Sequence, residues 1–153
     1  MRDDQPNPIT DTRSQFVLAV EKTNSVIREK LQRDPKQLAM LHKYRRRSVI
    51  PHIPADRNVT ILEIGCGAGS LLLQLGGMGY KSLSGFDLSP DNVTLCHGEG
   101  LSFVAQHDAL RLDSYRSAQG QRWDVVLCMD LLEHLPADAT LDFLCAARRA
   151  TAP

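Results

Sequence analysis

Glu63-Ile64-Gly65-Cys66-Gly67-Ala68-Gly69 is the stretch that decides the fold of this 153-residue chain. It begins at the end of a short β-rich run at 59–64 and precedes an apolar run at 70–75, which predicts a strand, a tight turn and a helix in that order. Glycines let the chain turn tightly and let a ligand approach the backbone. The helix that follows directs its N–H groups and its positive dipole end toward such a ligand. The stretch therefore predicts a ligand-binding turn at the end of a buried strand.

Outward from this turn, strand and helix patterns alternate along the chain. Strands are expected at 59–64, 80–87, 101–106 and 123–129, and helices are expected from Ser70, from Ser89-Pro90 and over 136–150. In the last helix, Leu141, Leu144 and Cys145 form one apolar stripe. This alternation is typical of an α/β, Rossmann-like parallel sheet with helices on both faces. Ligands of such sheets bind beyond the carboxyl ends of the strands.

The chain divides into three parts by composition. Residues 1–11 are polar and proline-containing and are expected to be a disordered tail. Residues 12–57 are expected to form N-terminal helices that act as a lid or cap, and the second of these begins at Asp34-Pro35, a capping residue followed by a first-turn proline. Residues 58–153 are expected to form the Rossmann-like domain.

Charge and cysteine usage exclude several function classes. The 18 basic and 18 acidic side chains balance, so nothing draws the whole chain to nucleic acid or to an anionic membrane. The four cysteines form no C-x-x-C pair and are interpreted as reduced thiols. No apolar run approaches the roughly 20 residues of a membrane span, and the start has no signal-peptide pattern. A cytoplasmic protein is expected.

Two carboxylates stand at the ends of predicted strands. Asp87 can accept hydrogen bonds from both hydroxyls of a ribose, which indicates adenosine binding without naming the cofactor. Asp108 lies at the end of the third strand. We interpret it as a ligand contact, and an exposed turn residue is a nearly equal alternative. The turn has G-x-G-x-G spacing, with Ser70 where the third glycine of the dinucleotide pattern G-x-G-x-x-G would fall. That departure argues against an NAD-dependent oxidoreductase.

The run WDVVLCMDLLEHLP at 123–136 resembles motif IV of the ubiquinone-biosynthesis O-methyltransferases, within the class I S-adenosylmethionine-dependent methyltransferases. The resemblance covers roughly residues 40–150. It implies S-adenosylmethionine as the cofactor and an N-terminal arginine placed at Arg46, with Arg45 and Arg47 as alternatives. The other contacts that it implies or supports are Glu63, Gly65, Cys66, Gly67, Gly69, Asp87, Leu88, Asp108, Ala109 and Met129.

The resemblance further implies methyl transfer to a small molecule, most readily to an oxygen. An oxygen acceptor must lose its proton, and His134 is the best candidate in this chain for the general base. Three alternatives stay open: a binding module without catalysis, an RNA 2′-O-methyltransferase-like enzyme, and the NAD-dependent oxidoreductase. Asp130, Glu133 and His134 also resemble part of the metal set of RNA 2′-O-methyltransferases. The later histidine of that set has no counterpart here, so no metal is expected.

The family implied by the resemblance has seven strands, and this sequence shows four strand signals. We therefore expect an incomplete sheet of order 3-2-1-4, a chain truncated after the fourth strand, and little or no transferase activity from it alone. The fourth strand would be an unpaired edge, and such edges favour pairing with another chain, here a homo-oligomer.

Overall fold

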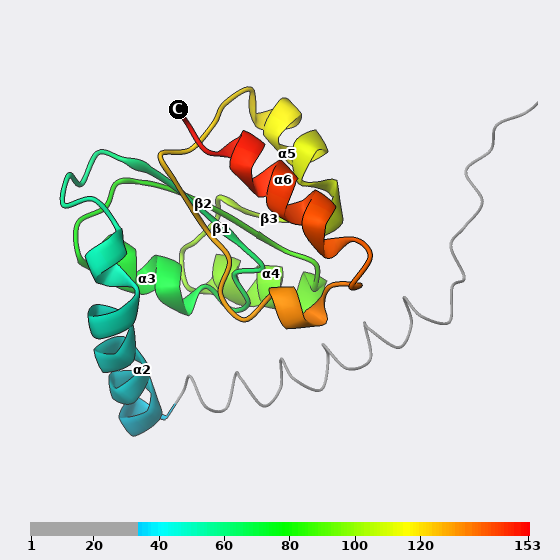
Figure 1. Ribbon diagram of the computed structural model, residues 1–153. Helices are drawn as coiled ribbons and strands as arrows, with labels where there is room; N and C mark the ends of the chain where they lie inside the picture. The colour runs from blue at the N-terminus through cyan, green and yellow to red at the C-terminus, as the bar shows by residue number, and fades with distance from the viewer. Residues whose placement is uncertain (1–33) are drawn as a thin grey trace, which may run out of the picture.

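The computed structural model describes residues 34–153, so the predicted tail at 1–11 and the helix expected from about residue 12 lie outside the described residues. The described chain forms one four-stranded parallel sheet in the order β3-β2-β1-β4 (Figure 1). Its strands are β1 (Thr60–Ile64), β2 (Ser82–Asp87), β3 (Val104–Gln106) and β4 (Val125–Leu127). The predicted fold class and strand order are confirmed.

The register of the sheet brings the carboxyl ends of its strands together. Central β1 pairs with β2 from Thr60 opposite Ser82 to Ile64 opposite Phe86. On the other side of β1, Glu63 lies opposite Leu127 of β4. Because the strands are parallel, the segments that follow them all leave from one edge, where ligands of such sheets bind.

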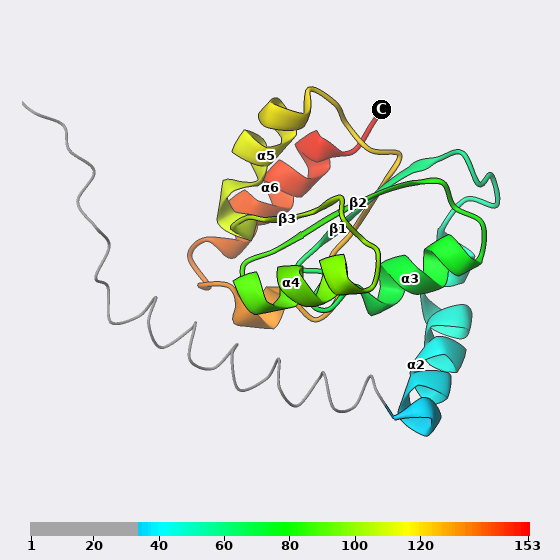
Figure 2. The ribbon, with the colours of Figure 1, turned by 180° about the vertical axis from the view of Figure 1, so that it is seen from behind.

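Helices cover both faces of this sheet (Figures 1 and 2). One face carries α3 (Ser70–Gly77) and α4 (Pro90–Gly98), and the other carries α5 (Leu112–Gln119) and α6 (Thr140–Ala150). Helix α2 (Pro35–Ser48) lies against α3. Three short 3-10 helices complete the described part: η1 (Ile50–His52), η2 (Ala109–Arg111) and η3 (Leu132–His134). Within residues 34–153, no helix combines the length and the apolar character needed to cross a bilayer.

Two helix starts follow directly from local sequence. The Asp34 carboxylate accepts the Lys36 N–H at 2.9 Å, with Pro35 in the first turn of α2. The Ser89 hydroxyl accepts the Asn92 N–H at 3.4 Å at the start of α4, again before a proline. Each side chain satisfies one of the N–H groups that a helix leaves without an internal partner, which confirms both predicted caps.

Helix α5 was not predicted from the sequence. It has eight residues and buries only Leu112 and Tyr115, too few apolar positions to show a helical period. Packing rather than propensity stabilises such a short helix. Its buried side chains join the core beneath α6.

The apolar stripe predicted for the last helix was wrong. Leu141 is 71% exposed, and Leu144 and Cys145 also face solvent. The buried residues of α6 are instead Phe143, Ala146 and Ala150, and the helix begins at Thr140 rather than at 136. Both sets have helical spacing, and the small alanines let the helix approach the sheet closely. A prediction based only on the largest apolar side chains therefore chose the solvent-exposed face of α6 as the buried one.

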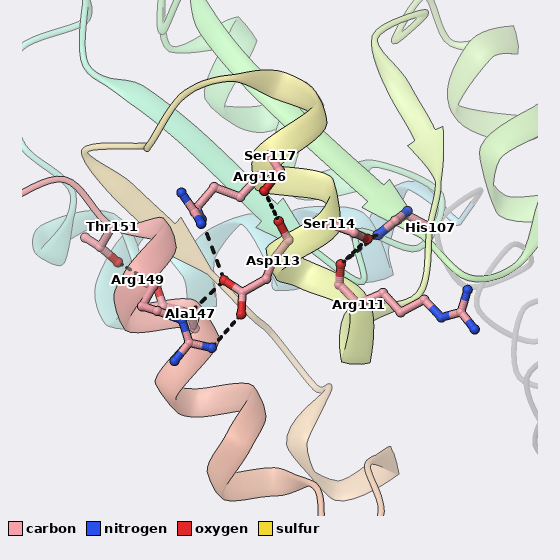
Figure 3. Close-up of polar contacts among 9 residues, drawn as sticks. All are labelled: His107, Arg111, Asp113, Ser114, Arg116, Ser117, Ala147, Arg149 and Thr151. Atoms are coloured by element: carbon pink, nitrogen blue, oxygen red, sulfur yellow. Dashed lines mark hydrogen bonds and ion pairs between the residues drawn. The ribbon is translucent and has the colours of Figure 1, made fainter.

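Polar contacts join α5 to α6 at the surface (Figure 3). The Asp113 carboxylate of α5 accepts two hydrogen bonds from the Arg149 guanidinium of α6, with Nε at 3.2 Å from Oδ1. Arg116 forms a second ion pair with Asp113, at 3.6 Å. Both partners of the Arg149 pair are largely exposed, so this contact orients the two helices and adds little stability.

The edge at β4 is partly paired, which corrects the expected bare edge. Thr151 forms a parallel bridge with Trp123, just before β4. The Trp123 N–H donates to Ala150 O at 2.9 Å, and the Ala152 N–H donates to Trp123 O at 2.7 Å. The residues after α6 thus occupy the first position along this edge, and Val125–Leu127 beyond it have only β1 as a neighbour among the described strands.

Candidate functional site

The turn after β1 needs its glycines. Gly65, Gly67 and Gly69 have φ angles of +68°, +55° and +77°, a region that other residues rarely adopt. A Cβ on Gly69 would lie 2.3 Å from the Leu101 side chain, and one on Gly65 would lie 3.1 Å from Leu131. Segments following β1, α4 and β4 therefore meet at this turn.

Hydrogen bonds tie this turn to β2. The N–H groups of Gly65 and Cys66 both donate to Phe86 O, at 2.9 and 3.1 Å. A ligand that contacts the backbone of Gly65 would therefore meet its Cα and carbonyl group, because the N–H is already engaged. The Cys66 side chain points away from the strand ends and packs in the apolar cluster beneath α4.

The Asp87 carboxylate accepts three hydrogen bonds from neighbouring segments of the site. Its Oδ2 accepts the Gly67 N–H at 2.7 Å, and its Oδ1 accepts the Ser89 N–H and the Asn92 side-chain amide, each at 2.9 Å. A carboxylate offers about four acceptor positions. One acceptor position on Oδ2 is therefore free for a ligand. If Asp87 accepted hydrogen bonds from both hydroxyls of a ribose, one of its three hydrogen bonds within the protein would have to break. Sequence reasoning missed Asn92, although it lies one turn into the helix after Asp87.

A hollow of about 60 Å³ lies at the carboxyl ends of β1, β2 and β3. It is lined by Gly65, Phe86, Asp87, Leu88, His107, Asp108, Ala109 and Leu135. Five of these are predicted cofactor contacts. The other three were missed, and for His107 its place beside Asp108 at the end of β3 was an available signal. The Asp108 Oδ1 accepts the Leu110 N–H at 2.9 Å, so Asp108 both starts η2 and faces the hollow.

Glu63 and Arg45 lie on the α3 side of the same turn. The Glu63 side chain is buried, and its Oε2 has no hydrogen-bond partner within residues 34–153. Burial raises the pKa of Glu63 to about 8, and the Arg45 guanidinium opposes that rise. Arg45 donates from Nη1 to the Ser70 hydroxyl at 2.7 Å. Burial lowers the pKa of Arg45, while Glu63 and Asp130 act in the opposite direction.

Arg46 is the arginine that the sequence analysis placed at the cofactor, but in the structure it does not line the hollow at the strand ends. It is exposed and lines a separate hollow of about 410 Å³ between α2, α3 and α4. Arg45, one of the two alternatives, is the arginine that lies at the turn. Successive side chains of a helix point in directions about 100° apart, so Arg45 and Arg46 face different sides of α2. The rotation of the helix, which the local sequence pattern does not fix, decides which arginine lies at the turn.

The segment after β4 bends sharply at Asp130. Its φ of +51° is the only positive value among non-glycine residues at 34–153, and such backbone is concentrated at functional sites. Met129 is half-buried in the apolar cluster on the α3 face, and the bend lets Leu131 pack over Gly65. His134 is exposed on η3 and does not line the hollow. In the described part of the chain, no three histidine, cysteine or acidic residues gather as a metal site.

Comparison with solved structures identifies the class of fold. The chain superimposes with a TM-score of 0.62 on magnesium protoporphyrin IX methyltransferase from Synechocystis, at 16% identity, covering 95% of this chain and 74% of that one. It matches a SAM dependent methyltransferase from Archaeoglobus fulgidus with a TM-score of 0.61 at 22% identity, over 82% of this chain and 52% of that one. The chain thus has a class I methyltransferase fold with strand order β3-β2-β1-β4.

The family follows from the sequence match. A family model described as a methyltransferase domain matches residues 61–153, and the chain belongs to this family. It is 29% identical over 121 residues to the ubiquinone biosynthesis O-methyltransferase of Hydrogenovibrio crunogenus, covering 76% of this chain and 49% of that protein. The chain therefore spans about half the length of this curated relative.

Proposed function

We propose that the hollow between the glycine turn, Asp87 and Asp108 binds the adenosyl part of S-adenosylmethionine, and that the protein transfers its methyl group to an oxygen of a small molecule. The observation that carries this proposal is that five predicted contact residues, from the ends of three strands, line one hollow. The name of the ubiquinone-biosynthesis relative supports an oxygen acceptor.

The residues at this hollow fit a nucleoside. Leu88 and Leu135 offer apolar surface for a base, and Asp87 keeps one acceptor position for a ribose hydroxyl. The Asp108 carboxylate lies where the amino group of an adenine could donate to it. The hollow is smaller than typical small-molecule sites of about 300–1,000 Å³, so it would hold one part of the cofactor while the rest lies along the turn.

Arg45 and Glu63 suit the amino-acid end of the cofactor. A guanidinium binds a carboxylate through paired hydrogen bonds, and the Glu63 carboxyl has an oxygen without a hydrogen-bond partner among residues 34–153. The two residues approach the turn from α2 and β1, on the side opposite Asp108. Arg45 therefore replaces Arg46 in the proposed site, and Gly67, Gly69, Cys66 and Met129 shape the surface between the two ends.

The chemistry asks little of the protein beyond positioning. When bound, the cofactor supplies a methyl group already activated on a sulfonium. The protein would orient the acceptor oxygen behind that methyl group and exclude water. We propose that His134, next to Leu135 at the hollow, accepts the proton of the acceptor hydroxyl once the acceptor is bound. No metal is assigned a role.

Calorimetric titration of the chain with S-adenosylmethionine and with NAD tests the proposal. We expect saturable binding of the first and none of the second. Asp87→Asn should weaken cofactor binding by roughly 10- to 100-fold, because a hydrogen bond to a charged group contributes about 1.5–3 kcal/mol. Asn keeps the size of the side chain, and its one oxygen can still accept the Ser89 N–H.

Asp91→Asn is the matched control, because Asp91 is an exposed carboxylate of α4 that does not line the hollow. Its affinity should equal that of the unchanged chain. Equal affinities for the Asp87 and Asp91 variants would remove Asp87 from the site. Cofactor binding without methyl transfer to any hydroxyl acceptor would favour the binding-module alternative.

We also propose a cellular location, an oligomeric state and a class of acceptor, each from a single observation. All four cysteines are free, which supports a reducing cytoplasm. The β4 edge beyond Trp123 supports a homo-oligomer, which sedimentation of the purified chain would test. The balanced charge supports a small-molecule acceptor over nucleic acid.

A further inference from the structure

Two cysteines from distant parts of the chain meet beneath the glycine turn. Cys66 belongs to the turn and Cys96 to α4, and both are buried and unpaired. Their Sγ atoms approach the same atom, Gly67 O, at 3.7 and 3.3 Å. They share an apolar cluster with Leu72 and Leu101. The fold thus places two thiols side by side at the most constrained backbone of the site.

The surroundings make the two thiols unequal. The hydrogen bond with Cys96 raises the pKa of Cys66, and burial acts in the same direction. The hydrogen bond from Cys66 lowers the pKa of Cys96, against burial. A thiol with a lowered pKa is the better nucleophile of a pair at neutral pH, and its neighbour can act as the resolving thiol.

We propose that Cys66 and Cys96 are an oxidation site that forms a reversible disulfide under peroxide and thereby weakens cofactor binding at the turn. The effect on binding rests on the proposed function, whereas the disulfide itself does not.

The reaction balances with hydrogen peroxide as the oxidant. The Cys96 thiolate attacks one peroxide oxygen, forming an S–O bond while the O–O bond breaks and hydroxide leaves. The Cys66 sulfur then attacks the Cys96 sulfur, forming the S–S bond while the S–O bond breaks. The sulfenic oxygen leaves as water with the Cys66 proton. Both sulfurs are oxidised, and both peroxide oxygens end as water.

Tight packing would transmit this change to the turn. A Cβ on Gly69 would lie 3.0 Å from the Cys96 sulfur, and one on Gly85 would lie 3.5 Å from the Cys66 sulfur. A disulfide brings its sulfurs to about 2.05 Å, so the turn and α4 must shift toward each other. Gly67 lies between them and donates its N–H to Asp87. Movement there changes the carboxylate that the proposed ribose contact needs.

The test treats the chain with hydrogen peroxide, blocks the remaining thiols and maps the peptides by mass spectrometry. We expect a linked peptide containing Cys66 and Cys96 that a dithiol reductant releases. Cofactor affinity of the oxidised chain should fall at least about tenfold and return on reduction. Absence of that linked peptide, or an unchanged affinity in the linked protein, would overturn the proposal.

Two variants separate this site from general oxidation damage. Cys96→Ala should bind cofactor normally and lose its sensitivity to peroxide, whereas Cys145→Ala, at an exposed position of α6, should stay sensitive. If Cys96→Ala does not fold, the peptide map of the unchanged chain still decides whether the bond forms. If the reduced chain binds no cofactor, the proposed function and the affinity effect both fail, and the linked peptide alone then decides the oxidation site.

Discussion

The two faces of the sheet are packed by different chemistry. On the α5/α6 face, the core is aromatic: the ring centroids of Tyr115 and Trp123 are 5.9 Å apart in a stacked pair, and those of Phe86 and Tyr115 are 4.5 Å apart. On the α3/α4 face and at the strand ends, buried polar groups accumulate. These are Glu63, Ser70, Gln74, Asp87 and Ser89, with the thiols of Cys66 and Cys96.

This difference gives the two faces of the sheet opposite effects on stability. Burying apolar area stabilises a fold, whereas burying a carboxyl without full hydrogen bonding destabilises it. The polar face therefore carries a cost that the aromatic face must offset. Glu63 and Gln74 each keep one buried oxygen without a hydrogen-bond partner among the described residues, which adds to the cost of this face.

Removing the largest buried side chain of the aromatic face should have the greatest effect. Trp123 is fully buried and donates from Nε1 to the Ser84 hydroxyl at 3.2 Å. Trp123→Ala should lower the free energy of unfolding by about 3–5 kcal/mol in urea titration. Leu141→Ala on the outer side of α6 is the control and should stay within about 0.5 kcal/mol. Similar losses in both variants would contradict the division between the faces.

Changing Glu63 should alter the dependence of stability on pH. The native state keeps the Glu63 proton up to a pKa of about 8, whereas the unfolded chain releases it near the ordinary value of 4.5. The native state thus binds more protons between these values, so stability falls as pH rises through that window. The melting temperature should drop by about 10 °C or more from pH 5 to pH 9, because each unit of pKa difference is worth about 1.4 kcal/mol, and Glu63→Gln should remove most of that drop.

Glu99→Gln provides the comparison for that titration, because Glu99 is an exposed carboxylate of the neighbouring α4 segment. It should retain the slope of the unchanged chain. A Glu63→Gln variant with the same pH slope as Glu99→Gln would mean that Glu63 is solvated in the native state, and the polar face would lose its main buried carboxyl group.

Breaking the surface contact between α5 and α6 should have the smallest effect. Asp113→Asn removes the ion pairs with Arg149 and Arg116 but leaves the aromatic core beneath them. The melting temperature should fall by less than about 3 °C, and the difference should shrink further in high salt. A larger fall would show that exposed charges, and not Phe143 and Trp123, hold α6 to the sheet.

Much of the fold could be predicted because its signals are local. The strands at β1 and β2, the glycine turn and the caps at Asp34 and Ser89 each depend on residues within one short stretch. Helix α5 and the buried face of α6 could not be predicted in the same way. Both are selected by packing against core residues outside their own segments, such as Phe86 and Trp123.

The sequence by itself determined the parallel sheet, the position of the glycine turn after β1 and the acidic residues at the ends of β2 and β3. Backbone preference and hydrophobic period act over a few residues, so they can be read without coordinates. Only the tertiary structure decided that Arg45 rather than Arg46 lies at the turn. It also decided that the Asn92 amide donates to Asp87 and that Cys66 and Cys96 pack in one cluster. These relations depend on helix phase and on the approach of distant segments, which the pattern of one stretch does not contain.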